Sequence, residues 1–326
     1  MAGLVIAVVS SGLPIWAKEG AKLDLNAPEQ VIVFPDWFQA INDIEATPDG
    51  TVWILADNML HGLDEQGAIR TAPTSYRFPR ALAYNETSKR LCVMDLDGLH
   101  LLGVDGDTIA QVEIRKSGIT PMGDLLIPYD KGFLVVGYNE KTGNVLNIFN
   151  ENGEFLRSFG DPVQNPEVVK FPPTILIPFG LSASGKWLVA VDPFAYDLLI
   201  YKDEVLTHRV RLPIPSGRLF GLVPEIKLSV EPEITTTTII PQASVRTAIF
   251  KDVVLVGVAS EGSPSVSAKF WFWAVDLTSG EILNAMTVDI TKIERYISFL
   301  GLDNKGDPLF WNNEGIFSVP VVSQQK

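Results

Sequence analysis

The sequence predicts an all-β protein, a six-bladed β-propeller made of four-stranded antiparallel blades. Six segments repeat one pattern, in which a polar turn leads into four to six apolar or β-branched residues. This pattern is typical of strands. The copies recur at intervals of about 40 to 50 residues, which is the length of a propeller blade. No segment beyond the N-terminal leader has the periodicity of a helix.

The turns that open the units set the period. From Gly50 to Gly132 the chain advances 82 residues, or two units of 41, and the later units are longer. A second turn closes the later strand pair of a unit, and its Gly, Asn or Asp supplies the positive φ of a tight hairpin. The six turn-and-strand segments are Thr47–Asp57, Asn85–Asp95, Tyr129–Asn139, Ser182–Asp192, Ile249–Ala259 and Asp303–Asn313.

The sixth unit has only three strands, which would leave an unpaired sheet edge. The segment Gln30–Pro35 has the pattern of a strand but no hairpin partner of its own. We therefore expect Val31–Phe34 to pair as the outer strand of the sixth blade and to close the ring. On this prediction, residues 30–323 form a single domain.

The N-terminus is mostly apolar up to Trp16 and turns polar after Ala17. It is too short to span a bilayer, and it resembles the hydrophobic and cleavage regions of a secretory signal. No Lys or Arg precedes the apolar run, and the cleavage triplet would be Ile15-Trp16-Ala17, so a buried N-terminal strand is the alternative. The prediction is a signal peptide over residues 1–17, a linker over 18–29, and a protein exported to the periplasm or the exterior. No later segment is apolar enough for a transmembrane helix.

The net negative charge of the chain argues against a nucleic-acid partner. The chain has 26 Lys and Arg against 39 Asp and Glu, a formal net charge of −13. Binding to nucleic acid needs a basic face that displaces counterions, so no nucleic-acid partner is expected. Cys92 is the only cysteine, which excludes an intramolecular disulfide and a zinc site made of cysteines. Its apolar neighbours indicate a small buried side chain.

Two further motifs are open to a structural or a functional interpretation. The run Phe270–Trp273, with sequence FWFW, alternates across a strand and is expected to pack between blades rather than to bind sugar. Asn85-Glu86-Thr87 matches an N-glycosylation acceptor.

One unit resembles a known family. The segment GNVLNIFNENGEFLRSFGDP, Gly143–Pro162, looks like an NHL repeat, in which a strand, an Asn/Asp-Gly turn and a strand ending in Phe-Gly recur. Trp53–Asp57 and Trp187–Asp192 are similar to the strand that precedes this motif. The resemblance implies the NHL or TolB-like class of six-bladed propellers. The Arg that usually follows in the family is missing, because Met59 and Leu60 stand at that place.

The period is broken by residues 212–242, which include five prolines and the run Thr235–Thr238. A long connection of this kind is uncommon and often functional. It is expected to be either a strand pair that lengthens one blade or an arm over one mouth of the ring.

The candidate site residues share one position in the repeat, the turn between the second and third strands of a blade. In a propeller these turns lie on the same face as the connections between blades. A carboxylate or amide there in five blades would focus negative potential and offer oxygen ligands to a divalent cation such as Ca²⁺, although Asp and Asn also cap turns. The candidates are Asp57, Asn58, Asp95, Asp97, Asn139, Glu140, Asp192, Tyr196, Asn312 and Asn313, with Asp197 and Glu314 beside them.

These residues leave two functions open. The favoured one is a non-catalytic binding or scaffold protein that presents one channel mouth to a peptide, a protein or a small ligand. The alternative is a lactonase-like hydrolase or lyase that depends on a divalent metal over the central channel. The two differ in whether the oxygen ligands converge, since fold alone does not decide function. No catalytic residue and no cofactor is assigned from the sequence.

Overall fold

The structure is a computed structural model that describes the greater part of the residues. These are residues 13–19, 21–24, 29–35, 38, 40–64, 67–162, 178–192, 195–213, 225–230, 235–240, 243–260, 269–289, 298–303, 305–312 and 315–323. Apart from strands they include two short 3-10 turns, η1 (Ile15–Ala17) and η2 (Ile114–Ser117). None of these described helical segments is long and apolar enough to cross a membrane.

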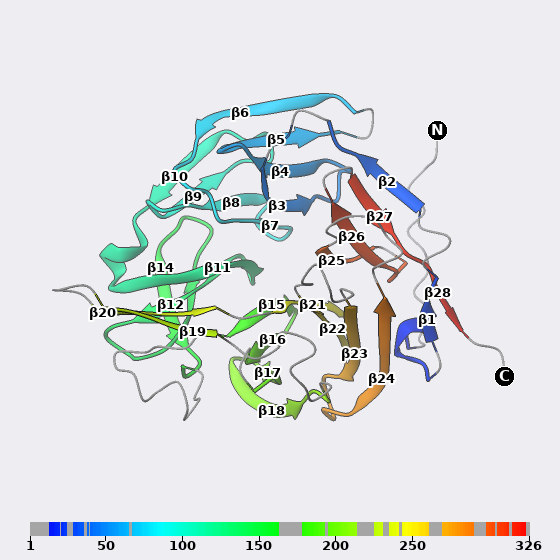
Figure 1. Cartoon of the computed structure of the whole chain (residues 1–326). Helices are drawn as coiled ribbons and strands as arrows, with labels where there is room; N and C mark the ends of the chain where they lie inside the picture. The colour runs from blue at the N-terminus through cyan, green and yellow to red at the C-terminus, as the bar shows by residue number, and fades with distance from the viewer. Residues whose placement is uncertain are drawn as a thin grey trace.

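Six four-stranded antiparallel sheets surround a central axis (Figure 1), so the prediction of a six-bladed propeller is confirmed. Blades 1 to 3 are β3 (Ile41–Ala46), β4 (Val52–Ala56), β5 (Met59–Leu63), β6 (Ile69–Ser75); β7 (Ala81–Asn85), β8 (Arg90–Met94), β9 (Leu99–Leu102), β10 (Thr108–Val112); and β11 (Ile119–Tyr129), β12 (Gly132–Asn139), β13 (Leu146–Phe149), β14 (Phe155–Phe159). Blades 4 to 6 are β15 (Phe179–Ser184), β16 (Trp187–Asp192), β17 (Asp197–Lys202), β18 (Val205–Arg211); β21 (Ala243–Phe250), β22 (Val253–Ser260), β23 (Lys269–Asp276), β24 (Ile282–Asp289); and β25 (Ser298–Leu302), β26 (Pro308–Asn312), β27 (Gly315–Ser318), β2 (Glu29–Val33).

The first strand of each blade lies nearest the axis, and β3, β7, β11, β15, β21 and β25 contact one another in this order around the ring. Because neighbouring strands are antiparallel, the turns of a blade alternate between two faces. The turns between first and second strands form what we call the hairpin face. The turns between second and third strands, and the connections between blades, form the crossover face.

The ring is closed by β2, as the sequence predicts. This strand pairs antiparallel with β27, from Glu29 opposite Ser318 to Val33 opposite Gly315. Phe34 follows directly and is only 3% exposed, because it packs in a cluster that joins blades 6 and 1. The N-terminal strand therefore completes the hydrogen bonds of the last blade and also anchors it to the first.

A second tie between the chain ends was not predicted. β1 (Ala21–Leu23) pairs with β28 (Val321–Ser323) in a two-stranded sheet outside the ring. The labelled strands β1 and β28 accordingly lie on the same side of the disc in Figure 1.

Aromatic side chains fill the seams beside blade 5. Trp271 and Trp273 pack in a cluster with residues of blade 4, whereas Phe270 and Phe272 pack in a cluster with residues of blade 6. The expected packing of this FWFW run between blades is therefore present. Cys92 is fully buried in another seam, where burial raises the pKa of its thiol.

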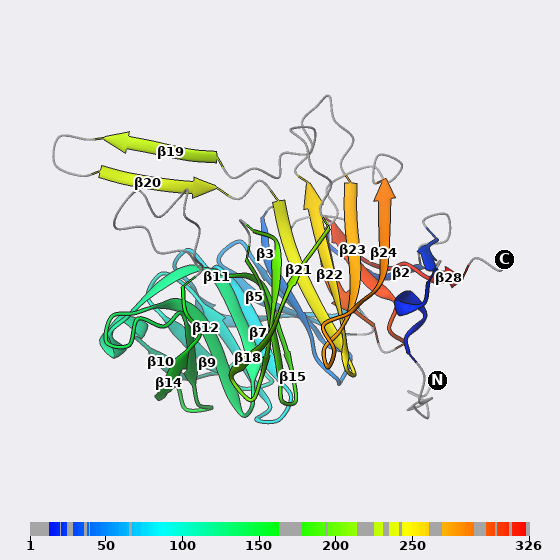
Figure 2. The ribbon, with the colours of Figure 1, turned by 90° about the horizontal axis from the view of Figure 1, so that it is seen from below.

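The long insertion after blade 4 includes β19 (Glu225–Val230) and β20 (Thr235–Ile240). These strands pair with each other over six residues in a sheet of their own, so they do not lengthen a blade. Figure 2 shows the pair apart from the blades, on the side of the crossover face.

Candidate functional site

The predicted site residues that the structure describes lie on the crossover face, at the second-to-third turns. In blade 1, Asp57 and Asn58 form the turn between β4 and β5 with φ of 52° and 64°. Two successive positive φ values define the tight hairpin turn that Asp and Asn tolerate best. The Asp57 carboxylate also accepts a hydrogen bond from the Ala40 N–H at 3.2 Å.

Asp95 is held more tightly in blade 2. One carboxylate oxygen accepts the N–H groups of Asp97 and Gly98 at 2.8 and 3.0 Å. The other accepts the Arg77 N–H at 3.0 Å and lies 2.9 Å from Nε2 of His100. The Asp95 side chain is 2% exposed, and its oxygens contact groups of the turn, of β9 and of the connection between blades 1 and 2.

Blades 3 and 4 repeat this capping. The side-chain oxygen of Asn139 accepts the N–H groups of Lys141 and Thr142 at 2.9 and 3.3 Å, and Glu140 next to it is exposed. Asp192 is 1% exposed, and its carboxylate accepts the Ala195 N–H at 3.0 Å. Asn139 and Asp192 therefore cap the backbone N–H groups of their turns, as Asp and Asn often do at strand ends.

The remaining candidates differ in their surroundings. Burial raises the pKa of Tyr196 to about 12, and the neighbouring Asp197 pairs with Arg211 and with Arg209. Asn312 ends β26, where its backbone pairs with Gly315. Asn313 and Glu314 lie outside the described residues.

Each of these described residues lies at the second-to-third turn of its own blade. Within the described part of the chain, no group of three or more His, Cys, Asp or Glu is arranged to hold a metal ion. A binding role for the crossover-face residues, with or without a cation, stays a prediction.

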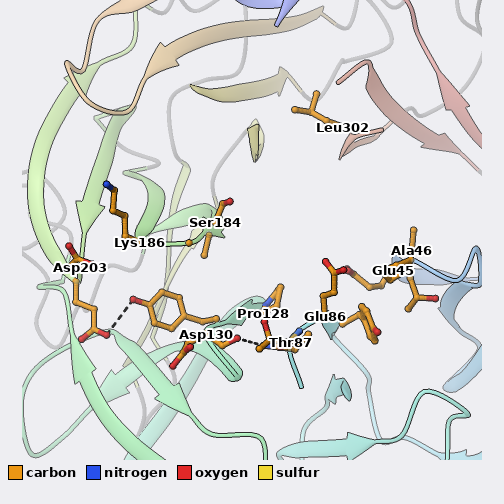
Figure 3. Close-up of a pocket in the computed structure, with 18 of the residues that line it drawn as sticks. Glu45, Ala46, Glu86, Thr87, Pro128, Asp130, Ser184, Lys186, Asp203 and Leu302 are labelled. Atoms are coloured by element: carbon orange, nitrogen blue, oxygen red, sulfur yellow. Dashed lines mark hydrogen bonds between the residues drawn. The ribbon is translucent and has the colours of Figure 1, made fainter. Parts of the chain in front are cut away.

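A large cavity opens on the hairpin face instead, and none of the predicted residues that the structure describes lines it. Its volume is about 1110 Å³. Figure 3 shows labelled residues of five blades around it: Glu45 and Ala46, Glu86 and Thr87, Pro128 and Asp130, Ser184, Lys186 and Asp203, and Leu302. The cavity is therefore the mouth of the channel formed by the first-to-second turns, with the Asp203 turn beside it.

The cavity wall is acidic. Six carboxylates and two cationic side chains line it, and both cations are engaged by neighbouring groups. Arg157 forms a bidentate ion pair with Glu204, and this contact lowers the pKa of Glu204. The ammonium group of Lys186 lies 5.6 Å from the centre of the Trp187 ring. A concave wall with such an excess of negative charge focuses potential that attracts cations.

The Arg157–Glu204 pair also joins two blades at the rim. Arg157 belongs to β14 of blade 3, and Glu204 lies in the turn between β17 and β18 of blade 4. The Tyr129 hydroxyl donates to Glu204 at 3.3 Å, and burial together with the Glu204 charge raises the pKa of Tyr129 to about 12. Tyr129 therefore stays a neutral donor throughout the physiological range.

Glu45 has the strongest perturbation among the carboxylates of the cavity. Burial, aided by the charge of Asp43, raises the pKa of Glu45 to about 8, although a hydrogen bond from the Tyr84 backbone acts in the opposite direction. Asp43, two residues earlier on β3, accepts the Leu82 N–H at 2.9 Å. The two carboxylates thus tie β3 to β7, and one of them takes up a proton near neutral pH. A strongly shifted carboxyl in a cavity is a feature of functional sites.

Asn85 fixes the wall between blades 2 and 3. Its amide donates to the carbonyls of Asp130 and Gly132 at 3.0 and 2.6 Å, and its oxygen accepts the N–H groups of Thr87 and Ser88, both at 3.0 Å. The side chain is 1% exposed. The amide nitrogen to which a glycan would be attached is therefore buried and bonded, so the folded domain does not present Asn85 as a glycosylation acceptor.

Asn85→Ala is expected to lower the free energy of unfolding by about 2–4 kcal/mol, because two buried carbonyls and two turn N–H groups lose their partner. Differential scanning calorimetry measures the change. Asn150→Ala is the matched control, since Asn150 caps an exposed turn with the same kind of bonds and is expected to cost less than about 1 kcal/mol. Equal losses in the two variants would contradict the role given to Asn85.

Sequence reasoning missed the cavity residues because it took the first-to-second turns only as hairpin turns. The signal was present in Glu45, a charged residue inside a strand pattern, and in polar turns such as Asn85–Thr87. That these turns surround an open mouth depends on the packing of five blades, which no single unit encodes.

Comparisons with known proteins support the fold. No family model and no curated protein sequence matches this chain. Among solved structures, a candidate exported protein of Bacteroides fragilis is 9% identical with a TM-score of 0.52, over 94% of this chain and 96% of that one. The extracellular domain of a candidate one-component system of B. thetaiotaomicron is 13% identical with a TM-score of 0.47. The match covers 88% of this chain and 35% of that one. A chain from a nidogen/laminin complex is 12% identical, with a TM-score of 0.43 over 76% and 84%. At such identities the first similarity shows a shared fold, and membership of the NHL or TolB-like family stays a prediction.

Proposed function

We propose that this chain is an exported, non-catalytic binding protein, and that its cavity on the hairpin face receives a cationic segment of a partner protein, a stretch that carries Lys or Arg. The observation that supports this most directly is the excess of carboxylates over cations in the wall of a cavity of about 1110 Å³. Ammonium and guanidinium groups form their strongest hydrogen bonds with carboxylates.

The chemistry of the wall favours a polar segment over an apolar small molecule. Fourteen of the twenty lining residues are polar or charged, whereas sites for small molecules are mostly apolar and usually have volumes of about 300–1,000 Å³. The net charge of −13 adds a long-range field of the same sign, which would speed the approach of a basic partner at low salt.

Export is supported by the apolar N-terminal run and its resemblance to a secretory leader. The similar structure from Bacteroides fragilis is itself described as a candidate exported protein. The hydrolase or lyase alternative stays a prediction, to which the described cavity adds no observation.

Binding can be measured by fluorescence anisotropy with a fluorescein-labelled hexalysine peptide at low salt. The triple variant Glu86→Gln, Asp130→Asn, Asp203→Asn removes three exposed charges from the wall. It is expected to weaken binding at least about tenfold, since each lost charge removes roughly 0.5 kcal/mol or more. Asn replaces Asp at the two positions with φ of 50°, because it tolerates this conformation.

The matched control removes the same charge from the crossover face, with Asp57→Asn, Asp97→Asn and Glu140→Gln, all three exposed. It is expected to change the affinity less than about twofold. A larger loss in this control would favour the ring predicted from the sequence. If neither triple variant weakens binding, the proposed function is wrong.

A further inference from the structure

The N-terminal segment is built into the seam between blades 5 and 6. Trp16 and Ala17 in η1 are 1% and 2% exposed, and Ala21 in β1 is 3% exposed. All three belong to the cluster that contains Phe270 and Phe310. A residue of the apolar leader pattern is therefore one of the largest fully buried side chains of the domain.

Hydrogen bonds and packing contacts hold this segment against blades 5 and 6 and against β28. The Trp16 carbonyl accepts the side-chain amide of Asn284 at 2.9 Å, on β24 of blade 5. The indole lies against the blade 6 hairpin turn, since a Cβ placed on Gly306 would come within 3.6 Å of Nε1 of Trp16. Beyond η1, β1 pairs with β28, and the Asp24 N–H donates to the Pro320 carbonyl at 2.9 Å.

These contacts conflict with a leader that ends at Ala17. Hydrolysis after Ala17 would remove Trp16 and leave an apolar gap between blades 5 and 6. Removing a buried aromatic side chain is among the most destabilising changes in a protein core. The neighbouring Leu13 and Ile15 are 50% and 48% exposed. The domain therefore buries Trp16 and Ala17 and leaves the apolar residues before them at the surface.

We propose that Pro14–Leu23 is retained in the mature protein as a closing strap, and that a processing peptidase, where it removes a leader, hydrolyses a peptide bond N-terminal to Pro14. In that step water supplies the oxygen of the new carboxylate and the hydrogen of the new amino group, and the strap keeps its full length. This inference does not depend on the ligand of the hairpin face.

The intact mass of the full chain, expressed in a bacterium and recovered from the periplasm or the medium, tests where processing occurs. The expected mass is that of a chain beginning at Pro14 or at an earlier residue, which includes the unprocessed chain. A mass that corresponds to a start at Lys18 overturns the proposal.

A pair of point variants in the full chain tests the strap independently of export. Trp16→Ala is expected to lower the melting temperature by roughly 5 °C or more. Ile15→Ala, in the same turn but half exposed, is expected to lower it by no more than about 1 °C. Equal melting temperatures for Trp16→Ala and the wild type would show that the seam does not need the strap.

Discussion

Replacing residues 29–34 with a glycine-serine segment of equal length is expected to lower the melting temperature by roughly 10 °C or more. The change removes the ladder between β2 and β27 and exposes the outer edge of blade 6. It also removes Phe34 from the cluster between blades 6 and 1. Loss of a buried Phe costs about 3–5 kcal/mol, and each lost ladder hydrogen bond costs about 0.5–1.5 kcal/mol. Differential scanning calorimetry at neutral pH measures the shift.

The control keeps the strand and changes its solvent face. Val31 and Val33 are 53% and 68% exposed, so Val31→Thr with Val33→Thr is expected to shift the melting temperature by less than about 2 °C. Phe34→Ala alone keeps the pairing of β2 with β27 and removes only the packing of Phe34 between blades 6 and 1. Its melting temperature therefore shows how much of the effect comes from that side chain. A melting temperature that is unchanged by the glycine-serine replacement would show that β2 does not close the ring.

The fold could be predicted because its information is local and repeated. Each blade displays its own turns, and the apolar or β-branched runs between them indicate strands without knowledge of the neighbouring blade. The closing strand followed from the same logic, since a three-stranded sixth unit and an unpaired Val31–Phe34 match each other. Packing of Phe270–Trp273 between blades followed from alternation along one strand.

The cavity could not be predicted in this way, because its wall is formed by turns that are far apart in the sequence and meet only in the closed ring. Polar turns mark both faces of the disc, and nothing in one unit distinguishes the turn of Asp95 from that of Glu86. The burial of Trp16 was not the favoured prediction for a different reason, although a buried N-terminal strand was left open as the alternative. A short apolar run followed by Lys18 and Glu19 is compatible with a secretory leader and with a buried strap. Only the packing of Trp16 in the seam between blades 5 and 6 distinguishes the two.

Glu45→Gln is expected to stabilise the protein at alkaline pH. The folded-state pKa of Glu45 is about 8, against an ordinary value of 4.5, so the folded protein holds a proton that the unfolded chain has released. The contribution of Glu45 to stability is accordingly complete below pH 4.5 and is lost as the pH rises toward 8. The loss is on the order of 3 kcal/mol, as the side chain is only partly buried. Glutamine keeps an oxygen for the Tyr84 N–H and carries no charge, so it avoids this loss.

The difference in melting temperature between Glu45→Gln and the wild type should therefore be small near pH 5 and grow to several degrees by pH 8.5. Because the other carboxylates titrate in both proteins, their effect on the melting temperature cancels when the difference is taken at each pH. Glu86→Gln is the matched control, because it removes an exposed charge from the same cavity. Its melting temperature is expected to differ from that of the wild type by the same amount at every pH in this range. If the difference for Glu45→Gln does not vary with pH, Glu45 is ionised in the folded protein at neutral pH. The wall of the cavity would then carry its sixth negative charge already before a ligand arrives, and binding of a cationic segment would release no proton from Glu45.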